Sequence, residues 1–144
     1  MSKLLFLQTG DYVLYDGEVH EVEKYDGGLG IDFHAIDDAD MPKVQGIELT
    51  DEILTLCGFK FVEGGGLFQD HYLYDDGRCR CILYNKQVHI VSGNECQIDK
   101  RNIEYLHQIQ QCMRVVMDEF DFIYFDNEGI DKLRKIAIKQ IKPV

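Results

Sequence analysis

The stretch Asn102–Phe120, NIEYLHQIQQCMRVVMDEF, decides how we expect this chain to fold. Apolar side chains recur in it at intervals of three and four, which is the spacing of one helix face. The predicted helix has Asp99 or Asn102 as its N-cap. An apolar face of this length must be covered, so we expect the helix to organise the core. The face comprises Ile103, Leu106, Ile109, Met113, Val116, Met117 and Phe120.

The forty residues before this helix predict an antiparallel meander. Turn-forming residues divide it at Gly64–Gly66, at Asp75–Gly77 and at the two-residue Asn85–Lys86. The sheet is expected to cover the apolar face of the helix. An edge strand is predicted at Cys96–Ile98. The main predicted strands are Phe59–Val62, Leu67–Tyr74, Arg78–Tyr84 and Gln87–Val91.

A short helix is predicted directly before the meander. Thr50 is a good N-cap because its hydroxyl can accept an otherwise unpaired backbone N–H, and Asp51 and Glu52 suit the positive start of a helix. Gly58 is expected to end the helix, since glycine adopts the left-handed conformation at little cost. The predicted buried side holds Ile53, Leu54, Leu56 and Cys57.

The N-terminal part carries the strongest hairpin signal. Residues Gly10–Tyr25, GDYVLYDGEVHEVEKY, contain two β-rich runs around Asp16-Gly17, a dipeptide that suits a tight turn. Short strands are expected at Ile31–Phe33 and around Val44. Four apolar residues of the hairpin do not alternate strictly, so we expect a bulge near Glu21 to bring them to one face. These four are Tyr12, Leu14, Val19 and Val22.

The C-terminal segment Gly129–Val144 predicts a second amphipathic helix. Five basic residues against Asp131 give it a net charge of +4, which leaves −15 for residues 1–128 of a chain whose net charge is −11. Three roles are open: docking onto the acidic body, which we favour; binding another copy or another protein; and contact with nucleic acid or anionic lipid, the least favoured. The apolar side is Ile130, Leu133, Ala137 and Ile141, and the opposite side is Lys132, Lys135, Lys139 and Lys142.

Together these elements predict an α+β fold in three parts. Residues 1–46 form a small unit of β-hairpins, residues 47–128 a module of helix, antiparallel β-meander and packed long helix, and residues 129–144 a C-terminal basic amphipathic helix. Within the second part, Asp121–Phe125 is either a final strand or an apolar connection between two helices. A chain of 144 residues suits one domain, or two very small ones that share a core.

The charge composition limits the kinds of partner that the protein can bind. The chain has 26 acidic and 15 basic residues, which opposes non-specific binding to nucleic acid or to an anionic membrane and favours a basic partner or a small ligand. No segment reaches the roughly 18 to 20 apolar residues of a membrane span, and Met1–Phe6 is too short for a signal-peptide core. We therefore expect a cytoplasmic protein with five reduced cysteines, an odd number without CxxC spacing.

A polar flank borders the apolar face of the long helix. His107, Gln110 and Arg114 lie on this flank and are candidates for a binding edge. The structural alternative is favoured for His107, because a histidine beside an apolar face is usually paired with a backbone carbonyl or a nearby side chain. Lys132, Lys135 and Lys139 of the tail are the other binding candidates.

Metal sites, cofactors and nucleophilic catalysis are weakly supported. Cys79 and Cys81 share a strand face within reach of His71 or His89 from adjoining strands, but structural zinc sites use knuckles on turns, so core thiols are favoured. The acidic loop with Asp37, Asp38 and Asp40 lacks the spacing of a calcium loop. No Ser or Cys nucleophile with an orienting histidine is marked, and the Gly64–Gly66 run lacks the Lys-Ser/Thr of a phosphate loop. We predict no metal and no cofactor.

Three motifs together resemble a family of small uncharacterised proteins from Bacteroidetes genomes and their phages or prophages. They are YVLYDGEV at residues 12–19, LTDEIL at 49–54 followed by CGF at 57–59, and YLHQIQ at 105–110, beside family patterns YVLY-x-GEV, LTEEILLKCGF and YVHQLQ. The resemblance implies that the N-terminal unit is like a small SH3-type barrel. It implies no activity. Family members usually end soon after the third motif, so the basic tail is an addition.

Two classes of function follow as hypotheses. The first is a non-enzymatic protein-interaction module of mobile-element or phage origin, working through exposed sheet edges, the flank of the long helix or the tail. The alternative is a small ligand-binding or enzymatic domain with a pocket where the N-terminal hairpins meet the later sheet. Mimicry of DNA by an acidic protein is a third possibility, and the sequence spacing of the carboxylates does not favour it.

Overall fold

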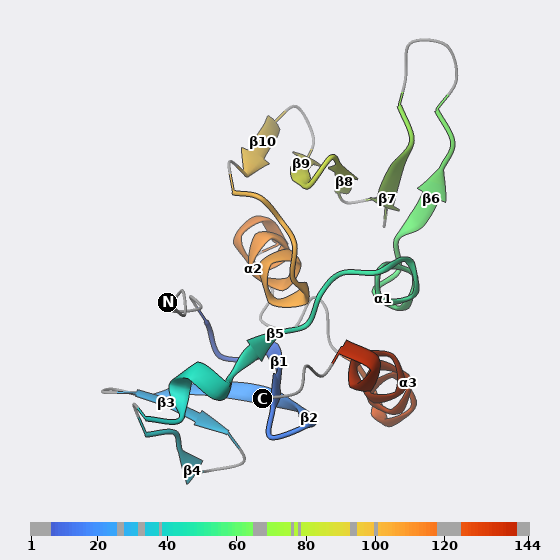
Figure 1. The fold of residues 1–144 in the computed structure, drawn as a ribbon. Coiled ribbons are helices and arrows are strands. Elements are labelled where there is room, and N and C mark those ends of the chain that lie inside the picture. The colour runs from blue at the N-terminus through green and yellow to red at the C-terminus, as the bar shows by residue number, and fades with distance from the viewer. Residues whose placement is uncertain are drawn as a thin grey trace.

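The computed structural model describes residues 7–25, 28–31, 34–37, 39–64, 69–75, 77, 79–92, 95–99, 101–117 and 125–140. Over these residues the chain is a mixed α+β structure with two five-stranded antiparallel sheets and three α-helices (Figure 1). The described strands do not close into a barrel, so the SH3-like form of the N-terminal unit stays a prediction, as do the boundaries of the three parts.

The first sheet has the strand order β4-β3-β2-β1-β5. The predicted hairpin is confirmed: Asp16 (φ 53°) and Gly17 (φ 76°) form its turn, and positive φ at both residues is typical of a type I′ turn. The third strand lies earlier than expected, at residues 28–31 instead of 31–33, and residues 32 and 33 lie outside the described residues. The strands are β1 (Tyr12–Tyr15), β2 (Glu18–Tyr25), β3 (Gly28–Ile31), β4 (His34–Ala35) and β5 (Gln45–Gly46), the last preceded by the 3₁₀ turn η1 (Met41–Lys43).

The predicted bulge near Glu21 is wrong, because the hairpin is buried on both faces. Tyr12, Leu14 and Val19 face the main core, whereas Val22 joins a second, smaller core with Leu7, Val13 and Val44 on the opposite face. A bulge does occur on the other strand. The N–H of Gly10 donates to the carbonyl of Val22 (2.9 Å), and the N–H of Val22 donates to the carbonyl of Asp11 (2.8 Å), so two residues oppose one. Gly10 has φ 94°, as this type of bulge requires.

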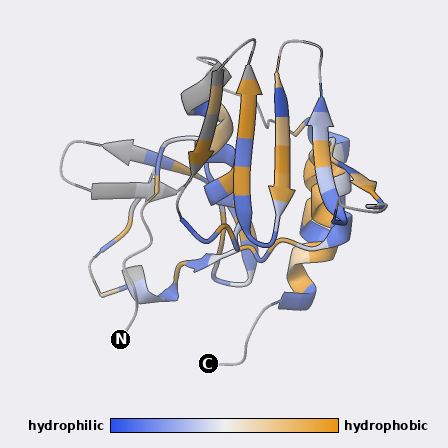
Figure 2. Cartoon of the chain, turned by 90° about the horizontal axis from the view of Figure 1, so that it is seen from above, coloured by the Kyte–Doolittle hydropathy of each residue, from blue (hydrophilic) through white to orange (hydrophobic). Residues whose placement is uncertain are grey.

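The second sheet is the predicted meander, with the order β10-β9-β8-β7-β6. Asn85 (φ 49°) and Lys86 (φ 64°) form the two-residue turn between β8 and β9. Figure 2 looks onto the face of this sheet that is turned away from the helices. Residues 67 and 68, which the sequence placed in a strand, lie outside the described residues. The strands are β6 (Lys60–Val62), β7 (His71–Asp75), β8 (Arg80–Tyr84), β9 (Gln87–Ser92) and β10 (Glu95–Asp99).

The short helix α1 (Asp51–Leu56) begins and ends as its local sequence predicts. The Thr50 hydroxyl oxygen accepts a hydrogen bond from the N–H of Ile53 (3.2 Å). Gly58 has φ 96°, and the N–H of Phe59 donates to the carbonyl of Leu54 (2.9 Å), which is the pattern of a Schellman cap.

The long helix α2 (Leu106–Met117) begins later than predicted, three residues after the start that an Asn102 cap would give, and neither Asp99 nor Asn102 caps it. Residues before Leu106 are extended, because the N–H of Ile103 donates to the carbonyl of Lys86 (2.7 Å) and Tyr105 forms a β-bridge with Glu48. The side-chain oxygen of Gln108 reaches back to the N–H groups of residues 104 (2.7 Å) and 105 (3.0 Å). This contact is the second half of a capping box, with Tyr105 at the N-cap position.

Helix α2 lies between the two sheets and contacts both β1 and β9 (Figure 1). One apolar cluster therefore joins the hairpin to the meander through this helix. Leu106, Ile109 and Met113 are fully buried at its centre. The prediction that this helix organises the core is confirmed, but its cover comes from both sheets and not from the meander alone.

The tail forms α3 (Asn127–Ala137) and the 3₁₀ turn η2 (Ile138–Gln140). Asp126 caps α3 by accepting the N–H of Gly129 (2.7 Å). The helix packs against α1 and β2, and Leu133 and Ala137 are fully buried in the main core. Docking onto the body is thus the arrangement found for α3.

Phe125 lies in no strand and packs on Tyr12 with ring centroids 5.2 Å apart; residues 121–124 lie outside the described residues. No described helix is both long and apolar enough to cross a membrane.

Candidate functional site

The predicted polar flank of α2 faces the protein interior. His107 and Gln110 are buried and Arg114 is half-buried, so these three side chains do not form an exposed edge. The amide of Gln110 bridges backbone groups of the bulge: its oxygen accepts the N–H of Tyr12 (3.0 Å), and its nitrogen donates to the carbonyl of Gly10 (2.9 Å). These contacts attach α2 to the first strand. A binding role for the flank stays a prediction.

A buried carboxylate, Asp11, completes this attachment. Asp11 is fully buried, and Arg114 donates to its Oδ1 at 2.5 Å. Gln111 Nε2 and the N–H of Gln8 both donate to its Oδ2 at 2.8 Å. Sequence reasoning missed Asp11 and Gln111, because the partners lie about a hundred residues apart and no local pattern links them.

His107 is not paired as predicted. Among the described residues, its buried Nδ1 has no hydrogen-bond partner. The imidazole stacks on Tyr105 with ring centroids 5.6 Å apart and an interplanar angle of 11°. Burial lowers the pKa of His107 to about 4, with Asp11 opposing the shift and Arg101 adding to it. The histidine is therefore neutral at physiological pH.

The predicted tail lysines do not gather with the flank of α2. Lys132 pairs with Glu128 (3.3 Å), and both Lys132 and Lys135 border a shallow hollow whose other side carries Asp51 and Glu52 of α1. Lys139 is exposed on η2. The positive side of α3 thus lies beside the acidic start of α1, which favours docking electrostatically.

The two cysteines considered for zinc are both buried. Cys79 precedes β8 and Cys81 lies within it, and burial raises the pKa of the Cys81 thiol. Over the described part of the chain, no group of three or more His, Cys, Asp and Glu side chains is placed to hold a metal ion.

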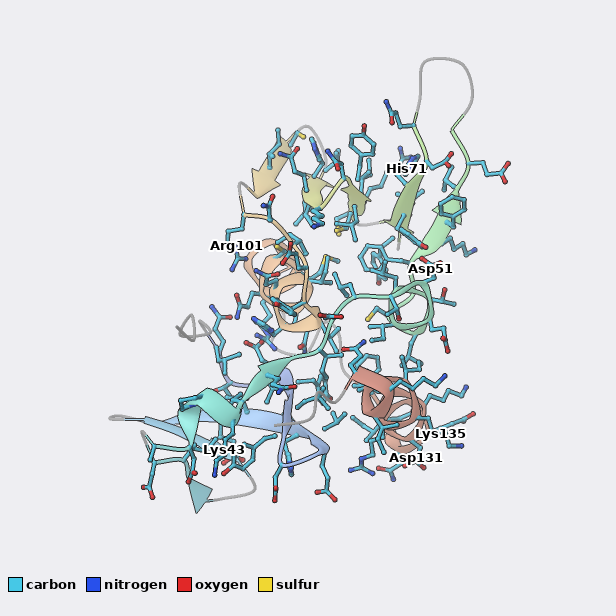
Figure 3. All side chains as sticks on the ribbon, in the orientation of Figure 1. Lys43, Asp51, His71, Arg101, Asp131 and Lys135 are labelled. Carbon is cyan, nitrogen blue, oxygen red and sulfur yellow. The ribbon has the colours of Figure 1, made fainter. Side chains whose placement is uncertain are left out.

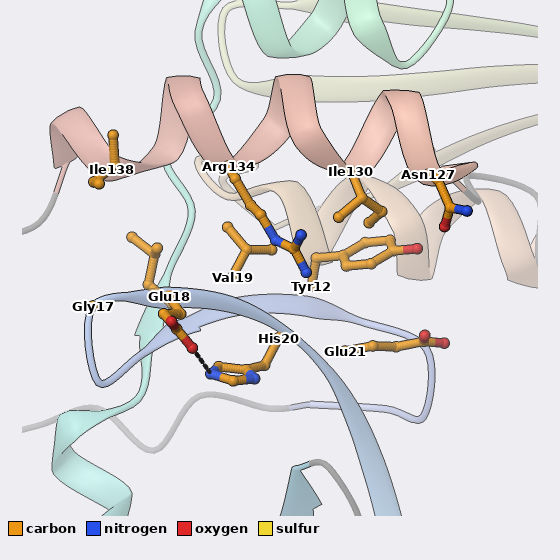
Figure 4. A pocket seen from close by; sticks show the side chains of 11 residues that line it. Tyr12, Gly17, Glu18, Val19, His20, Glu21, Asn127, Ile130, Arg134 and Ile138 are labelled. Carbon is orange, nitrogen blue, oxygen red and sulfur yellow. Dashed lines mark ion pairs between the residues drawn. The ribbon is translucent and has the colours of Figure 1, made fainter.

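The hairpin borders a hollow of ≈ 690 Å³, but its opposite wall is α3 and not the later sheet (Figure 4). Arg134 points from α3 into the space beside Tyr12 and Val19. Glu18 lies 3.7 Å from His20 on the strand side, and Arg134 is also 3.4 Å from Asp131. The lining therefore mixes both signs of charge.

A second depression, of ≈ 540 Å³, lies where five separate segments meet beside the second sheet. Figure 3 marks two of its residues, Asp51 at the start of α1 and His71 on β7. We call this depression the acidic groove. Its lining comes from residues 48–54 (without 52 and 53), Phe61 with residues 70–72, residues 83–86 (without 84) and residues 103–105.

The acidic groove has an apolar floor and a charged rim. Leu54, Leu83 and Ile103 are buried beneath it. Phe61 is 53% exposed and packs edge-on against Tyr72, with ring centroids 5.3 Å apart. Among the described residues, the rim carries one cation, Lys86, which pairs with Glu104 at 3.0 Å, and four carboxylates, so their formal charge is −3. The carboxylates are Glu48, Asp51, Asp70 and Glu104.

Tyr72 belongs to the groove as a hydrogen-bonding group. Its hydroxyl donates to a carboxylate oxygen of Asp51, and this hydrogen bond, with smaller contributions from burial and from the charge of Asp51, raises the pKa of Tyr72 to about 12. The phenol therefore stays protonated at neutral pH and is a poor general base or nucleophile. The described groups whose pKa is strongly shifted also include Cys57, Cys81 and His107, and none of these three lines the groove.

Comparison of the chain with protein-family models, with curated proteins and with solved structures found no match.

Proposed function

We propose that the protein is a non-enzymatic protein-interaction module that binds a basic segment of another protein in the acidic groove. The observation that supports this most is the combination, in one depression, of an exposed aromatic ring, an apolar floor and a rim with net charge −3. The acidic composition of the whole chain adds to it, since a net charge of −11 attracts basic partners. The resemblance to proteins of mobile elements supports an origin in such an element and supplies no activity.

The side chain that fits the groove is lysine or arginine. Its aliphatic stem packs on apolar surface such as Phe61 and Leu54, while its charged end meets the carboxylates of Glu48 and Glu104. Exposed ion pairs contribute about 0.2 to 1 kcal/mol each, and a cation over an exposed aromatic ring about 0.5 to 1 kcal/mol. These magnitudes favour a weak, salt-sensitive complex whose specificity comes from several such contacts.

The alternative, a small ligand-binding or enzymatic domain, rests on the hairpin hollow. Arg134 and His20 would be its functional side chains. We place it second, because the described lining lacks cysteine and serine and carries carboxylates beside Arg134, an arrangement that selects no one ligand.

Peptide selection against the full-length protein tests the proposal. A random twelve-residue peptide library is panned at low salt, and the recovered peptides are titrated by fluorescence anisotropy against a Glu48→Gln/Glu104→Gln variant. We expect enrichment of Lys and Arg, and an affinity for the variant that is about fivefold lower, as expected when two exposed ion pairs are removed.

The matched control is Asp37→Asn/Glu128→Gln, which removes the same charge from exposed residues that do not line the groove. Its affinity should stay within about twofold of the parent, because only screened long-range attraction changes. Peptides without basic enrichment, or equal losses in the two double variants, would overturn the proposal.

A further inference from the structure

One face of the second sheet carries a row of mostly apolar side chains and has no described element over it. Paired residues of neighbouring strands point to the same side, so the register places Leu73, Ile82, His89 and Ile98 in one row across β7, β8, β9 and β10. Alternation along the strands adds further apolar residues to this side. We call this side the outer face. Its aliphatic and aromatic residues are Val62, Leu73, Ile82, Tyr84, Val91 and Ile98, and its uncharged polar residues and thiol are His71, Gln87, His89 and Cys96.

The outer face differs in kind from the inner one. Inner-face residues such as Cys81, Val88 and Ile90 are buried in the main core beneath α2. The six apolar residues of the outer face belong to neither core; five are half-buried by their neighbours in the sheet, and Ile98 is 55% exposed. The helices α1 and α2 lie beneath the opposite side of the sheet (Figure 1).

The charge of the outer face is also unlike that of the rest of the molecule. Its described charged residues are Lys60, Arg80 and Asp75, and Arg80 pairs with Asp75 at 3.2 Å. With neutral histidines their sum is +1, on a chain whose net charge is −11. Two copies that approach through this face therefore bring together the surface where their mutual repulsion is smallest.

We propose that the outer face packs against the same face of a second copy of the chain. A sheet surface with rows of apolar side chains and little net charge is suited to pack on a copy of itself, and two such sheets stack about 10 Å apart in the manner of a β-sandwich. A two-fold axis near Ile82 of the central strand β8 lets each residue of one copy meet its counterparts in the other. The contact removes Leu73, Ile82 and Ile98 from water.

The size of the face sets the strength of the dimer. Five strands about 4.8 Å apart and about five residues long cover roughly 400 Å² in projection on each copy, or about 800 Å² for both, which is below the roughly 1,200 Å² of standard specific interfaces and predicts a weak contact. Dimerisation is therefore concentration-dependent. It also leaves most of the acidic groove open, because Tyr72 and Leu83 line the groove from the inner face and His71 alone of its described strand residues lines it from the outer face, so each dimer presents two grooves.

Sedimentation equilibrium of the full-length protein from about 1 to about 200 µM measures this association. The average mass should rise from 16.7 kDa toward twice that value as concentration increases. Ile98→Glu should raise the dissociation constant at least tenfold, since it places a charge in the apolar contact of both copies. Ile82→Thr should weaken association as well while retaining a β-branched side chain in the strand.

Ile138→Glu is the matched control. Ile138 is 60% exposed on η2, so the same change of residue type is made at similar exposure away from the outer face, and the dissociation constant should not change. Thermal unfolding followed by circular dichroism verifies that each variant is folded. A parent protein that stays at 16.7 kDa throughout, or equal losses in Ile98→Glu and Ile138→Glu, would refute the dimer. Neither result bears on peptide binding in the groove.

Discussion

At the scale of single residues, polar side chains inside the protein define how α2 sits on the first strand. Asp11 accepts three hydrogen bonds, from Arg114, Gln111 and the N–H of Gln8, and its side chain is fully buried. A buried carboxylate is tolerated only with such partners, because an unpaired charge in the interior costs several kcal/mol. The network therefore specifies the position of the helix more than it adds to stability.

Replacing Asp11 should show how strongly the folded state depends on the buried hydrogen-bond network. Asp11→Asn keeps the shape of the side chain but removes the charge that Arg114 faces and turns one acceptor into a donor opposite existing donors. We expect the free energy of unfolding, measured by urea denaturation, to fall by about 2 to 4 kcal/mol. Asp37→Asn, at an exposed position, should change it by less than about 0.5 kcal/mol. A loss below 1 kcal/mol at Asp11 would contradict the role assigned to the network.

His107 makes stability depend on pH. Its pKa is about 4 in the folded protein against 6.5 for an unperturbed histidine, so the unfolded chain binds more protons between these pKa values. Stability therefore rises with pH from about 4 to about 6.5 and is lost as pH falls through this window. At about 1.4 kcal/mol per pKa unit, the contribution is on the order of 3 kcal/mol.

Comparison with His107→Gln isolates this contribution from the carboxylates that titrate in the same range. Urea denaturation at several pH values between about 4 and 7.5 should give a smaller slope of stability against pH for the variant. Equal slopes for the two proteins would show that His107 is not the titrating group.

At the scale of elements, the tail helix is held by burial and by one unusual polar contact. Leu133 and Ala137 enter the main core, and the side-chain amide of Gln140 bonds both backbone groups of Glu48, accepting its N–H at 2.7 Å and donating to its carbonyl at 2.9 Å. Gln140 thus supplies, for the segment between β5 and α1, the two backbone hydrogen bonds that a neighbouring strand would otherwise make. The apolar spacing of the tail predicted the burial of Leu133 and Ala137, whereas nothing in the sequence pointed to the hydrogen bonds of Gln140.

Truncation of one buried side chain tests whether α3 is part of the folded core. Leu133→Ala removes a fully buried side chain and leaves a cavity, so unfolding free energy should drop by about 2 to 5 kcal/mol in urea denaturation. Ile138→Ala, on the exposed side of the same segment, should cost less than about 0.5 kcal/mol. If both substitutions were equally mild, α3 would not be docked in solution.

Local sequence patterns are sufficient to predict several of the turns and helix ends. The Asp16-Gly17 and Asn85–Lys86 turns, the Thr50 cap and the Gly58 stop were predicted because each depends on a few adjacent residues. The start of α2 was misplaced, since Ile103 has helical spacing but pairs its N–H with Lys86, seventeen residues away. The bulge was misplaced because the apolar spacing was read as one buried face, whereas Val13 and Val22 fill a second core.

At the scale of the whole molecule, α2 divides the protein into two sheets, and the second sheet separates two surfaces of different chemistry. The inner edge of that sheet borders the acidic groove, and the outer face carries rows of apolar side chains and a small net charge. An acidic groove that binds basic segments and an outer face that pairs copies would act together. A dimer then holds two grooves, and a partner with two basic segments gains affinity through effective concentration.

The sequence by itself determined the α+β class, most strands and turns of the meander, the N-terminal hairpin and the existence of the tail helix, because local backbone preferences and apolar periodicity act over a few residues. Only the tertiary structure decided the burial of His107 and Gln110, the partners of Asp11, and the acidic groove. These depend on which distant segments meet: the groove takes its rim from residues as far apart as Glu48 and Glu104. A carboxylate acquires its role from the side chains packed around it, and one sequence does not specify those neighbours until the chain has folded.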